Sequence, residues 1–430
     1  GVYQLFTYGG SVTDNGLAYG TLPAGTTLAD LTLQTAIANQ INLVVGSDLL
    51  FWNGSKTTGD GTVSGGTGTW ASGTTNWTNT AGTSSNAWND TFAVFGGDSG
   101  TVTVAGQQSF TGLQFLTDGY TVQAGTGGAL QAVNSAGGDL AAVRVGTGTA
   151  VISAPLVGTG GIEKLDAGTL YLTGANTYTG GTTVSGGTLM GNTTSLQGNI
   201  TNNASLVFDQ STSGQFAGIL AGTGSITKQG AGDLLIVGSQ PFNGAFAVNQ
   251  GSLTVGNAAN PGTVLGAQVT VANGAGLTGT GSVGSLDNHG IVATGNGGSN
   301  LSVAGNFSNA SDGTLVVTVT PTLTNYLSVG GTANLGGSLQ VLGLGDYTGD
   351  TTYTLVSATG GVTGTFASNN LSSLLFLDTD LAYGANNVTL AVARNDVSFA
   401  SVAQTSNQRA VATALDSAAA PASLRSAIIS

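Results

Sequence analysis

The sequence contains no cysteine and very little charge. None of the 430 residues is Cys, which excludes a disulfide framework and a thiolate metal site. Charged residues make up only 6% of the chain, whereas an ordinary globular protein has about 25%. Among the 20 acids, Glu163 is the single Glu and the rest are Asp, a residue that favours turns over helices. The surface must therefore consist mainly of uncharged polar side chains.

Basic residues and long apolar runs are scarce too. Seven Lys and Arg against 20 acids leave a net charge of −13. Because nucleic-acid binding needs clustered Lys and Arg, we predict no nucleic-acid partner. No apolar run reaches the roughly 18 residues of a membrane span. The chain begins with Gly and shows no basic-then-apolar leader, so we expect it to be part of a longer protein.

Glycine is abundant, and a repeat organises the middle of the chain. There are 73 Gly residues, as expected if turns recur throughout. Residues 158–189 read GTGGIEKLDAGTLYLTGANTYTGGTTVSGGTL, and a degenerate copy, GTGSITKQGAGDLLIVGSQPFNGAFAVNQGSL, occupies residues 222–253. Within each copy, apolar residues alternate in short runs that Gly, Thr, Asn and Ser separate, which predicts strands joined by turns. A fixed period of such strands is typical of a solenoid.

The same pattern predicts further strands outside the repeat. They fall at residues 101–105, 113–116, 120–123 and 141–145. The segment LADLTLQTAIANQINL near the N-terminus fits either strands or a helix, and periodicity leaves both open. After residue 394 Gly disappears and Ala becomes common, so NQRAVATALDSAA predicts a helix that ends before Pro421.

Four tryptophans lie between residues 51 and 106: Trp52, Trp70, Trp77 and Trp88. Buried indoles could fill the core or cap the open end of a coil. Exposed indoles could instead form a platform on which glycans stack. We favour the packing interpretation.

The repeat resembles the passenger-associated repeat of type V secreted autotransporters of Gram-negative bacteria. Other stretches are similar to passengers of the AIDA/pertactin-like adhesin group: the tryptophan-rich stretch ending in AVFGGDSGTVTVAG, and YLSVGGTANLGGSLQVL followed by YTLVSATGGVTGTF. Residues 407–416 look like the linker helix that enters an outer-membrane barrel. The resemblance implies an all-β, right-handed parallel β-helix with a short C-terminal helical linker.

This resemblance also implies a division of the chain. Residues 1–325 would form the β-helix passenger, with its repeats at 158–189 and 222–253. Residues 326–393 would be an autochaperone-like segment that seeds folding, and residues 394–430 a linker toward a barrel outside this sequence. We expect about 15 to 18 turns if each takes about 22 to 25 residues.

One motif suggests a protease. Gly97-Asp98-Ser99-Gly100 matches the nucleophile motif of chymotrypsin-like enzymes. A serine nucleophile needs a base within hydrogen-bond reach, and the single histidine, His289, follows Ser99 by 190 residues. On a solenoid that separation is many turns, so we predict a Gly-Asp-Ser-Gly bend.

A polysaccharide lyase is the second enzymatic alternative, because β-helices host that chemistry with Asp-bound Ca²⁺ and a basic residue. Lys164 and Lys228 occupy matching repeat positions, with Glu163 and Asp166 beside the first. We interpret these lysines as exterior ladder residues.

Two acidic pairs offer oxygen atoms to a cation. They are Asp346 with Asp350 and Asp378 with Asp380. Neither pair matches a known calcium loop, so we predict that they cap turns and that His289 also lies in a turn. We therefore predict no catalytic, cofactor-binding or metal-binding residue, no cofactor and no enzyme activity.

The predicted function is adhesion at the surface of a Gram-negative bacterium, as an anchored or released passenger. Polar faces with few charges would mediate self-association, hence aggregation or biofilm, and attachment to a host protein or glycan in virulence. The first alternative is a structural stem and folding template for an upstream effector. The lesser alternative is an enzyme acting on polysaccharides.

Overall fold

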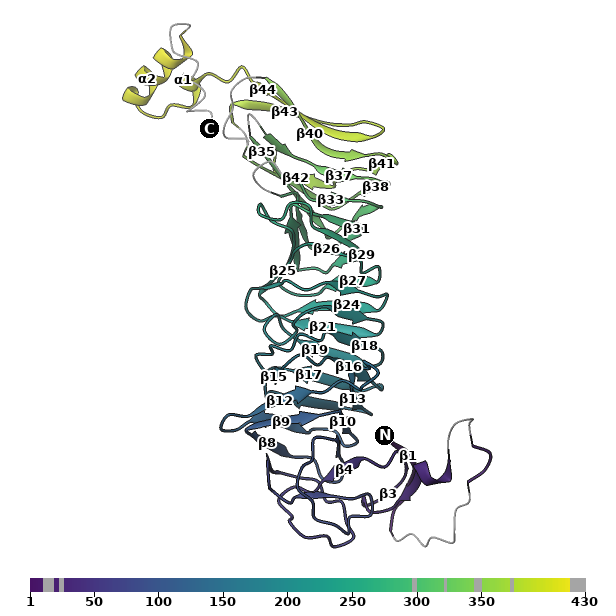
Figure 1. The fold of residues 1–430 in the computed structure, drawn as a ribbon. Coiled ribbons are helices and arrows are strands. Elements are labelled where there is room, and N and C mark those ends of the chain that lie inside the picture. The colour runs from purple at the N-terminus through teal and green to yellow at the C-terminus, as the bar shows by residue number, and fades with distance from the viewer. Residues whose placement is uncertain are drawn as a thin grey trace. The chain divides into compact units, whose positions relative to one another are not determined.

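Short β-strands make up almost all regular structure in the protein (Figure 1). The computed structural model describes residues 1–10, 19–22, 27–295, 300–320, 323–343, 350–371 and 375–417. Contacts divide the chain into two compact units. The first comprises Gly1–Asp209 with Gly218–Ser225, and the second comprises Gln210–Ala217 with Ile226–Ser430.

Parallel strands from successive turns stack in the first unit. One stack contains eight parallel strands: β4 (Leu49–Trp52), β7 (Phe92–Phe95), β10 (Gly112–Phe115), β13 (Ala141–Val145), β16 (Ile162–Leu165), β18 (Thr182–Val184), β20 (Ile200–Asn202) and β23 (Leu220–Ala221). The short strand β6 (Trp77–Thr78) pairs antiparallel with β4 at the end of this stack. A second stack contains β5 (Gly68–Ala71), β8 (Thr101–Ala105), β11 (Thr121–Ala124), β14 (Thr149–Ile152), β17 (Thr169–Leu172), β19 (Thr188–Gly191) and β21 (Ser205–Asp209). A short third stack contains β9 (Gln107–Phe110), β12 (Ala129–Ala132) and β15 (Leu156–Val157).

The core lies between these stacks, and alternation fills it. In β13, Ala141, Val143 and Val145 are buried while the two residues between them are only partly buried. The predicted strand at 141–145 coincides with β13, and the other three predicted strands coincide with or overlap β8, β10 and β11. Each turn thus buries its apolar side chains against the turns before and after it.

A turn in the repeat region takes about 20 residues, because Ile162 pairs with Thr182, Thr182 with Ile200, and Ile200 with Leu220. The two sequence copies start sixty-four residues apart. The repeat period is therefore not a whole number of turns.

The N-terminal segment forms a separate three-stranded antiparallel sheet. Its strands are ordered β1 (Val2–Thr7), β3 (Gln40–Val45) and β2 (Leu31–Gln34), and the 3₁₀ helix η1 (Leu28–Asp30) precedes β2. The segment that fitted either a helix or strands thus forms two strands after one short 3₁₀ turn. Its outer β1 residues include exposed Tyr3, Leu5 and Phe6.

The second unit repeats the architecture with two stacks. One contains β22 (Gly214–Phe216), β25 (Asp233–Ile236), β28 (Ser252–Val255), β30 (Gly276–Gly279), β32 (Ile291–Ala293), β35 (Thr314–Thr320), β39 (Ser338–Leu342) and β42 (Ser368–Asn369), with β36 (Leu323–Asn325) antiparallel to β35. The other contains β24 (Ser225–Gln229), β26 (Ser239–Gln240), β27 (Ala245–Val248), β29 (Val264–Val271), β31 (Ser282–Asn288), β33 (Ser302–Val303), β34 (Phe307–Asn309), β37 (Leu327–Val329), β38 (Ala333–Leu335), β40 (Thr351–Ala358) and β41 (Val362–Gly364).

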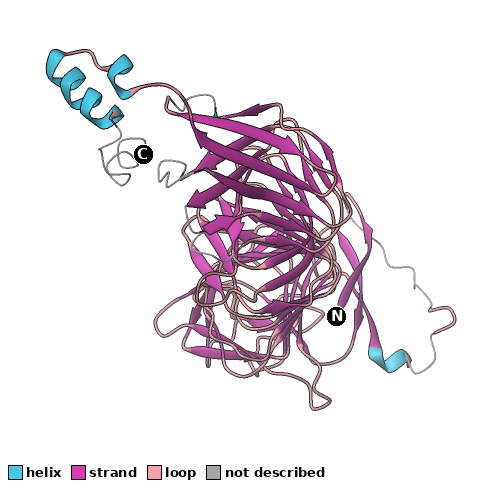
Figure 2. Ribbon diagram, turned by 90° about the horizontal axis from the view of Figure 1, so that it is seen from above, coloured by secondary structure: helices cyan, strands magenta, loops and turns pink. Residues whose placement is uncertain are grey.

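An antiparallel meander follows the last parallel turns of this unit. It consists of β40, β44 (Asn387–Arg394) and β43 (Leu377–Tyr383). Two helices come next, α1 (Phe399–Val402) and α2 (Ser406–Asp416). This pair and η1 are the helices whose bounds the structure describes, and Figure 2 shows them in cyan. The predicted C-terminal helix is α2. Among the described helices, none has the length and hydropathy needed to span a bilayer.

The parallel β-solenoid confirms the predicted fold class, but the predicted number of turns is wrong. There are about 12 turns. Some turns are longer than expected, since Gly112 of β10 pairs with Ala142 of β13. The N-terminal sheet and the C-terminal meander also use residues that add no parallel turn. The predicted boundaries at residues 325 and 393 stay predictions.

Candidate functional site

The four tryptophans form a buried cluster, which confirms the packing interpretation. The side chains of Trp52, Trp70 and Trp77 are fully buried and Trp88 is 9% exposed. The ring centroid of Trp77 lies 5.1 Å from that of Trp52, 5.1 Å from that of Trp70 and 4.5 Å from that of Trp88. The alternative of a glycan-stacking platform is wrong, because the indole faces contact one another and Phe95 instead of solvent.

The Gly-Asp-Ser-Gly motif is a bend between β7 and β8, as predicted. Gly97 has a left-handed φ of 71°, and the backbone of Asp98 bridges to Gly65. The Tyr120 hydroxyl lies 2.6 Å from the carbonyl oxygen of Asp98, and burial raises the pKa of that phenol. These contacts hold the backbone of the bend, so they give the motif a structural explanation.

His289 directly follows β31 in the second unit and is not placed with the motif, which lies in the first. Its Nδ1 is 2.8 Å from an Oδ1 of Asp312, and its Nε2 is 3.6 Å from an Oδ2 of Asp287. All three side chains are about two-fifths exposed. In the part of the chain that the structure describes, no three His, Asp or Glu side chains are grouped so that they could hold a metal ion.

The prediction that Lys164 and Lys228 are exterior ladder residues is wrong. Both side chains are fully buried. Each ammonium group points into a corner of the coil and donates to backbone carbonyl oxygens. Lys164 lies two residues after the buried Ile162 on the same strand, so both side chains point to the same face. The alternation in IEKL therefore indicated that Lys164 is buried, and our prediction did not use it.

The prediction that the acidic pairs cap turns is wrong for Asp378 and Asp380 and stays a prediction for Asp346 with Asp350. Asp378 and Asp380 lie two residues apart on strand β43 and are both exposed. Asp350 accepts a hydrogen bond from the backbone N–H of Arg394 at 3.4 Å. Asp346 lies outside the described residues.

Outward positions of the first unit line up in two ladders. Register places partners from β14, β17, β19 and β21 on top of one another, about 4.8 Å apart. The hydroxyl ladder consists of Thr149, Thr169, Thr188 and Ser205. The neighbouring apolar ladder consists of Val151, Tyr171, Met190 and Val207. All of these residues are partly exposed.

The apolar ladder has one polar anchor. The Tyr171 hydroxyl donates a hydrogen bond to an Oδ2 of Asp209 at 2.8 Å. Burial raises the pKa of Tyr171, and the adjacent Asp209 carboxylate raises it further. The phenol is therefore neutral and held in place at physiological pH.

The second unit carries two polar ladders on one stack. The serine ladder joins β31, β33, β37 and β40 and consists of Ser282, Ser302, Ser328 and Ser357. The mixed polar ladder joins β29, β31, β34, β38 and β41 and consists of Thr270, Asp287, Ser308, Asn334 and Thr363. Sequence reasoning foresaw Thr- and Asn-rich faces but not these ladders, because identifying them requires the register between turns.

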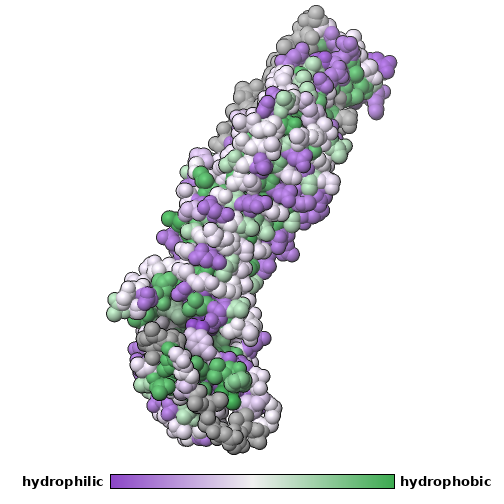
Figure 3. All heavy atoms as spheres, turned by 90° about the vertical axis from the view of Figure 1, so that its right-hand side faces the viewer, coloured by the Kyte–Doolittle hydropathy of each residue, from purple (hydrophilic) through white to green (hydrophobic). Residues whose placement is uncertain are grey.

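These ladders give the turns a polar surface with few ions. Figure 3 shows pale and light purple residues over most of the turns on one face, whereas strongly hydrophobic residues gather toward the N-terminal end. Asp287 is the single charged member of the four ladders. Such a surface offers hydroxyl and amide groups that both donate and accept hydrogen bonds.

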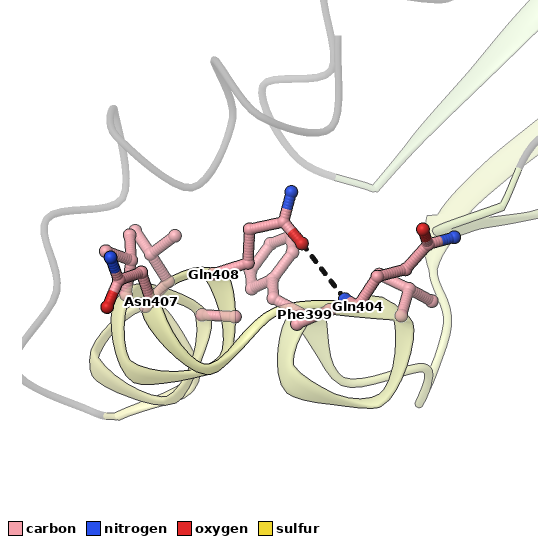
Figure 4. Close-up of a pocket in the computed structure, with 9 residues that line it drawn as sticks. Phe399, Gln404, Asn407 and Gln408 are labelled. Carbon is pink, nitrogen blue, oxygen red and sulfur yellow. Dashed lines mark hydrogen bonds between the residues drawn. The ribbon is translucent and has the colours of Figure 1, made fainter.

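An open pocket of about 660 Å³ lies on the α1–α2 pair. Figure 4 shows Phe399, Gln404, Asn407 and Gln408 around it, with the backbone N–H of Gln404 donating to Oε1 of Gln408 at 3.0 Å. Val411, which also lines it, is 63% exposed. The pocket is mainly apolar and contains no acid or base, so nothing in it suits acid–base chemistry.

Comparison with known proteins agrees with the resemblance seen in the sequence. The family described as Passenger-associated-transport-repeat matches residues 162–190 and 226–255. Over 198 residues the chain is 43% identical to "Adhesin BmaC autotransporter" of Brucella suis biovar 1 (strain 1330). This match covers 42% of the chain and 5% of that relative. Over 210 residues the chain is 31% identical to "Extracellular serine protease" of Serratia marcescens. This match covers 46% of the chain and 19% of that relative.

These findings confirm the similarity to type V autotransporter passengers and the predicted location at the surface of, or outside, a Gram-negative cell. The chain spans only a small part of both relatives. One of them is named an adhesin and the other a protease, so the names alone do not decide between binding and catalysis.

Proposed function

We propose that this chain is an adhesive segment of a cell-surface passenger. Its polar ladders join one passenger to another, which aggregates bacteria and supports biofilm, and they also attach the cell to host proteins or glycans. Helix α2 then connects the passenger toward an outer-membrane barrel. The observation that carries the proposal is the stacking of uncharged polar side chains in register, above all the serine ladder.

Ladder geometry favours binding to an identical surface. A hydroxyl group donates one hydrogen bond and accepts others, so two serine ladders complement each other in either direction. The spacing of about 4.8 Å is the same on both partners because the backbone sets it. Each contact is weak, about 0.5–1.5 kcal/mol, so many must form together, and a long flat face provides them.

The similarity to a protein named as an adhesin supports this function. The surroundings of Ser99, the serine that most resembles a nucleophile, support a function without catalysis. Ser99 sits in the bend of the Gly-Asp-Ser-Gly motif, and the single histidine belongs to the other compact unit. Purified chain should therefore leave protein, ester and polyuronate substrates intact, and turnover that Ser99→Ala or Lys164→Met removes would contradict the proposal.

The test is display of the full-length protein on bacteria that lack other adhesins. We expect the cells to settle faster than cells without it. Replacing the four serine-ladder residues with Ala should abolish settling, because it removes the hydroxyls and keeps the backbone. The matched control is Thr314→Val with Ser338→Ala and Ser368→Ala, whose outward hydroxyls line up on the other stack of the same unit. Cells that neither settle nor bind host cells would refute the proposal.

A second candidate is a stem that presents an effector located elsewhere in the full-length protein. The match to the extracellular serine protease favours it, because 19% of that relative is covered and the remainder lies outside the match. Deleting residues 1–430 from the full-length protein distinguishes the two. If the chain is a stem, the deletion should lower the effector's activity in the medium. If the chain is an adhesin, the deletion should abolish settling of the cells.

A further inference from the structure

The chain contains only three lysines, and two of them occupy the same position of the repeat. Lys164 and Lys228 are the third residues of the two segments that match the passenger-associated family. Both are fully buried. The third, Lys56, is exposed and pairs with Asp60 at 2.8 Å. In a chain with so little charge, two ammonium groups inside the coil require a physical reason.

The ammonium group of Lys164 is surrounded by carbonyl oxygens of two successive turns. It donates to Leu165 O at 2.7 Å and Asp166 O at 2.9 Å in its own corner, and to Gly186 O at 3.1 Å in the next turn. Three acceptors match the three N–H bonds of an ammonium group. The next turn also donates a hydrogen bond back to the lysine, because Ser185 N–H lies 3.0 Å from Lys164 O.

Lys228 makes the same connection one repeat later. Its ammonium donates to Gly230 O at 2.6 Å and to Gln250 O of the next turn at 2.8 Å, with Gln229 O at 3.3 Å. The N–H of Asn249 donates to Lys228 O at 2.9 Å. Both copies of the repeat therefore build the same arrangement, although Leu165 and Asp166 of the first are replaced by Gln229 and Gly230 in the second.

The corners explain why a donor is needed there. Asp166 and Gly230 take the equivalent position and both have a left-handed φ, 64° and 81°. In the following turn Gly187 and Gly251 are left-handed too, with φ of 60° and 63°. These residues turn the chain sharply, and the carbonyls around them face the buried ammonium groups. A buried carbonyl that lacks a donor is costly.

Other corners of the coil use an amide for the same purpose. Buried Asn309 donates through Nδ2 to Gly336 O at 2.7 Å and Gly313 O at 3.2 Å. Asn202 donates through Nδ2 to Ser225 O at 2.9 Å. An amide offers two N–H bonds and an ammonium three, so lysine suits the corner at which three carbonyls converge.

We propose that the lysine of each passenger-associated repeat is a turn clasp, whose ammonium group locks the corner of its own turn to the corner of the next and thereby fixes the register between them. Register needs such a device because neighbouring strands carry similar Thr, Val, Leu and Gly residues. A shift by two residues would keep apolar residues inside, but it would move the ammonium away from its carbonyls into the apolar core. The penalty for that burial selects one register.

Hydrogen exchange tests the clasp one turn at a time in the 430-residue chain. Lys164→Met keeps the length of the side chain and removes the donor. We expect the amides of Ser185 and Gly186, which both donate to Lys164 O, to exchange at least about tenfold faster in this variant. Lys228→Met should instead affect the amide of Asn249, which donates to Lys228 O. Unchanged exchange at the turn that follows the replaced lysine would overturn the proposal.

Lys56→Met is the matched control, because it removes a lysine whose side chain is 41% exposed. It should leave exchange at both corners unchanged, and equal acceleration by all three variants would also overturn the proposal. Acylation of the unaltered protein gives a measurement that requires no variant. We expect Lys164 and Lys228 to react at least about a hundredfold more slowly than Lys56 in the native state and equally fast in denaturant. Equal rates in the native state would refute the clasp.

Discussion

The tryptophan cluster allows a stability prediction in which two similar substitutions have different effects. Trp77 lies at the centre of the cluster, and its indole Nε1 is buried without a hydrogen-bond partner. Trp52 is equally buried, but its Nε1 donates to the carbonyl oxygen of Gly66 at 2.8 Å. Replacement by Phe keeps an aromatic ring in both cases. The two substitutions therefore differ in the hydrogen bond that is lost.

The structure sets the expected magnitudes. Trp77→Ala removes a whole buried indole and should cost about 3–5 kcal/mol. Trp77→Phe loses some packing but relieves a buried N–H whose desolvation costs about 1–3 kcal/mol, so the net change should stay within about 1 kcal/mol. Trp52→Phe loses packing and also leaves the Gly66 carbonyl without its donor, so it should cost about 2–4 kcal/mol.

Guanidinium unfolding followed by tryptophan fluorescence measures these differences. All four tryptophans lie between residues 52 and 88, so the signal reports this part of the first unit. We expect Trp77→Ala to be the most destabilised, then Trp52→Phe, then Trp77→Phe. The reasoning is refuted if Trp77→Phe costs as much as Trp52→Phe, or if Trp77→Ala costs less than about 1 kcal/mol.

Two further predictions concern a glycine and a buried lysine. At Gly65, where φ is 66°, a Cβ would lie 2.0 Å from Gly96 O, whereas at Gly66, where φ is 88°, it would meet nothing within 4 Å. Calorimetry should show that Gly65→Ala costs at least about 3 kcal/mol and Gly66→Ala about 1 kcal/mol, and equal losses would contradict this. Burial lowers the pKa of Lys164 from its ordinary 10.5 to about 8, although Asp166 opposes the shift. The folded chain therefore loses this proton at lower pH than the unfolded chain, so the free energy of unfolding should rise from pH 8 to pH 10.5 relative to Lys164→Met; a flat or falling difference would count against it.

Much of the fold could be predicted because local pattern and long-range packing agree. Alternation in residues 141–145 marks β13 within its bounds, and the loss of Gly with gain of Ala marks α2. Residues 28–43 were ambiguous because their apolar spacing satisfies both periods. Long-range pairing decides for strands, since β3 pairs with β1 on one side and with β2 on the other. Such pairing is invisible in a local window.

The functional surfaces were harder to foresee for a related reason. The serine ladder unites Ser282, Ser302, Ser328 and Ser357, whose separation in sequence is irregular, so no fixed spacing reveals it. The prediction for Lys164 was wrong because we assumed that a charged residue faces water. Its position two residues after the buried Ile162 on one strand indicated an inward side chain. Carbonyl oxygens at left-handed corners provide the partners, and these follow from backbone conformation that composition does not encode.

The mismatch between a sixty-four-residue repeat and turns of about 20 residues bears on how such a protein diversifies. When a gene segment of that length is duplicated, each strand of the new copy starts at a different angular position around the solenoid axis from the matching strand of the original. Its inward residues still find a core, while its outward residues emerge on a different side. Duplication therefore redistributes inherited surface chemistry around the circumference without any new substitution.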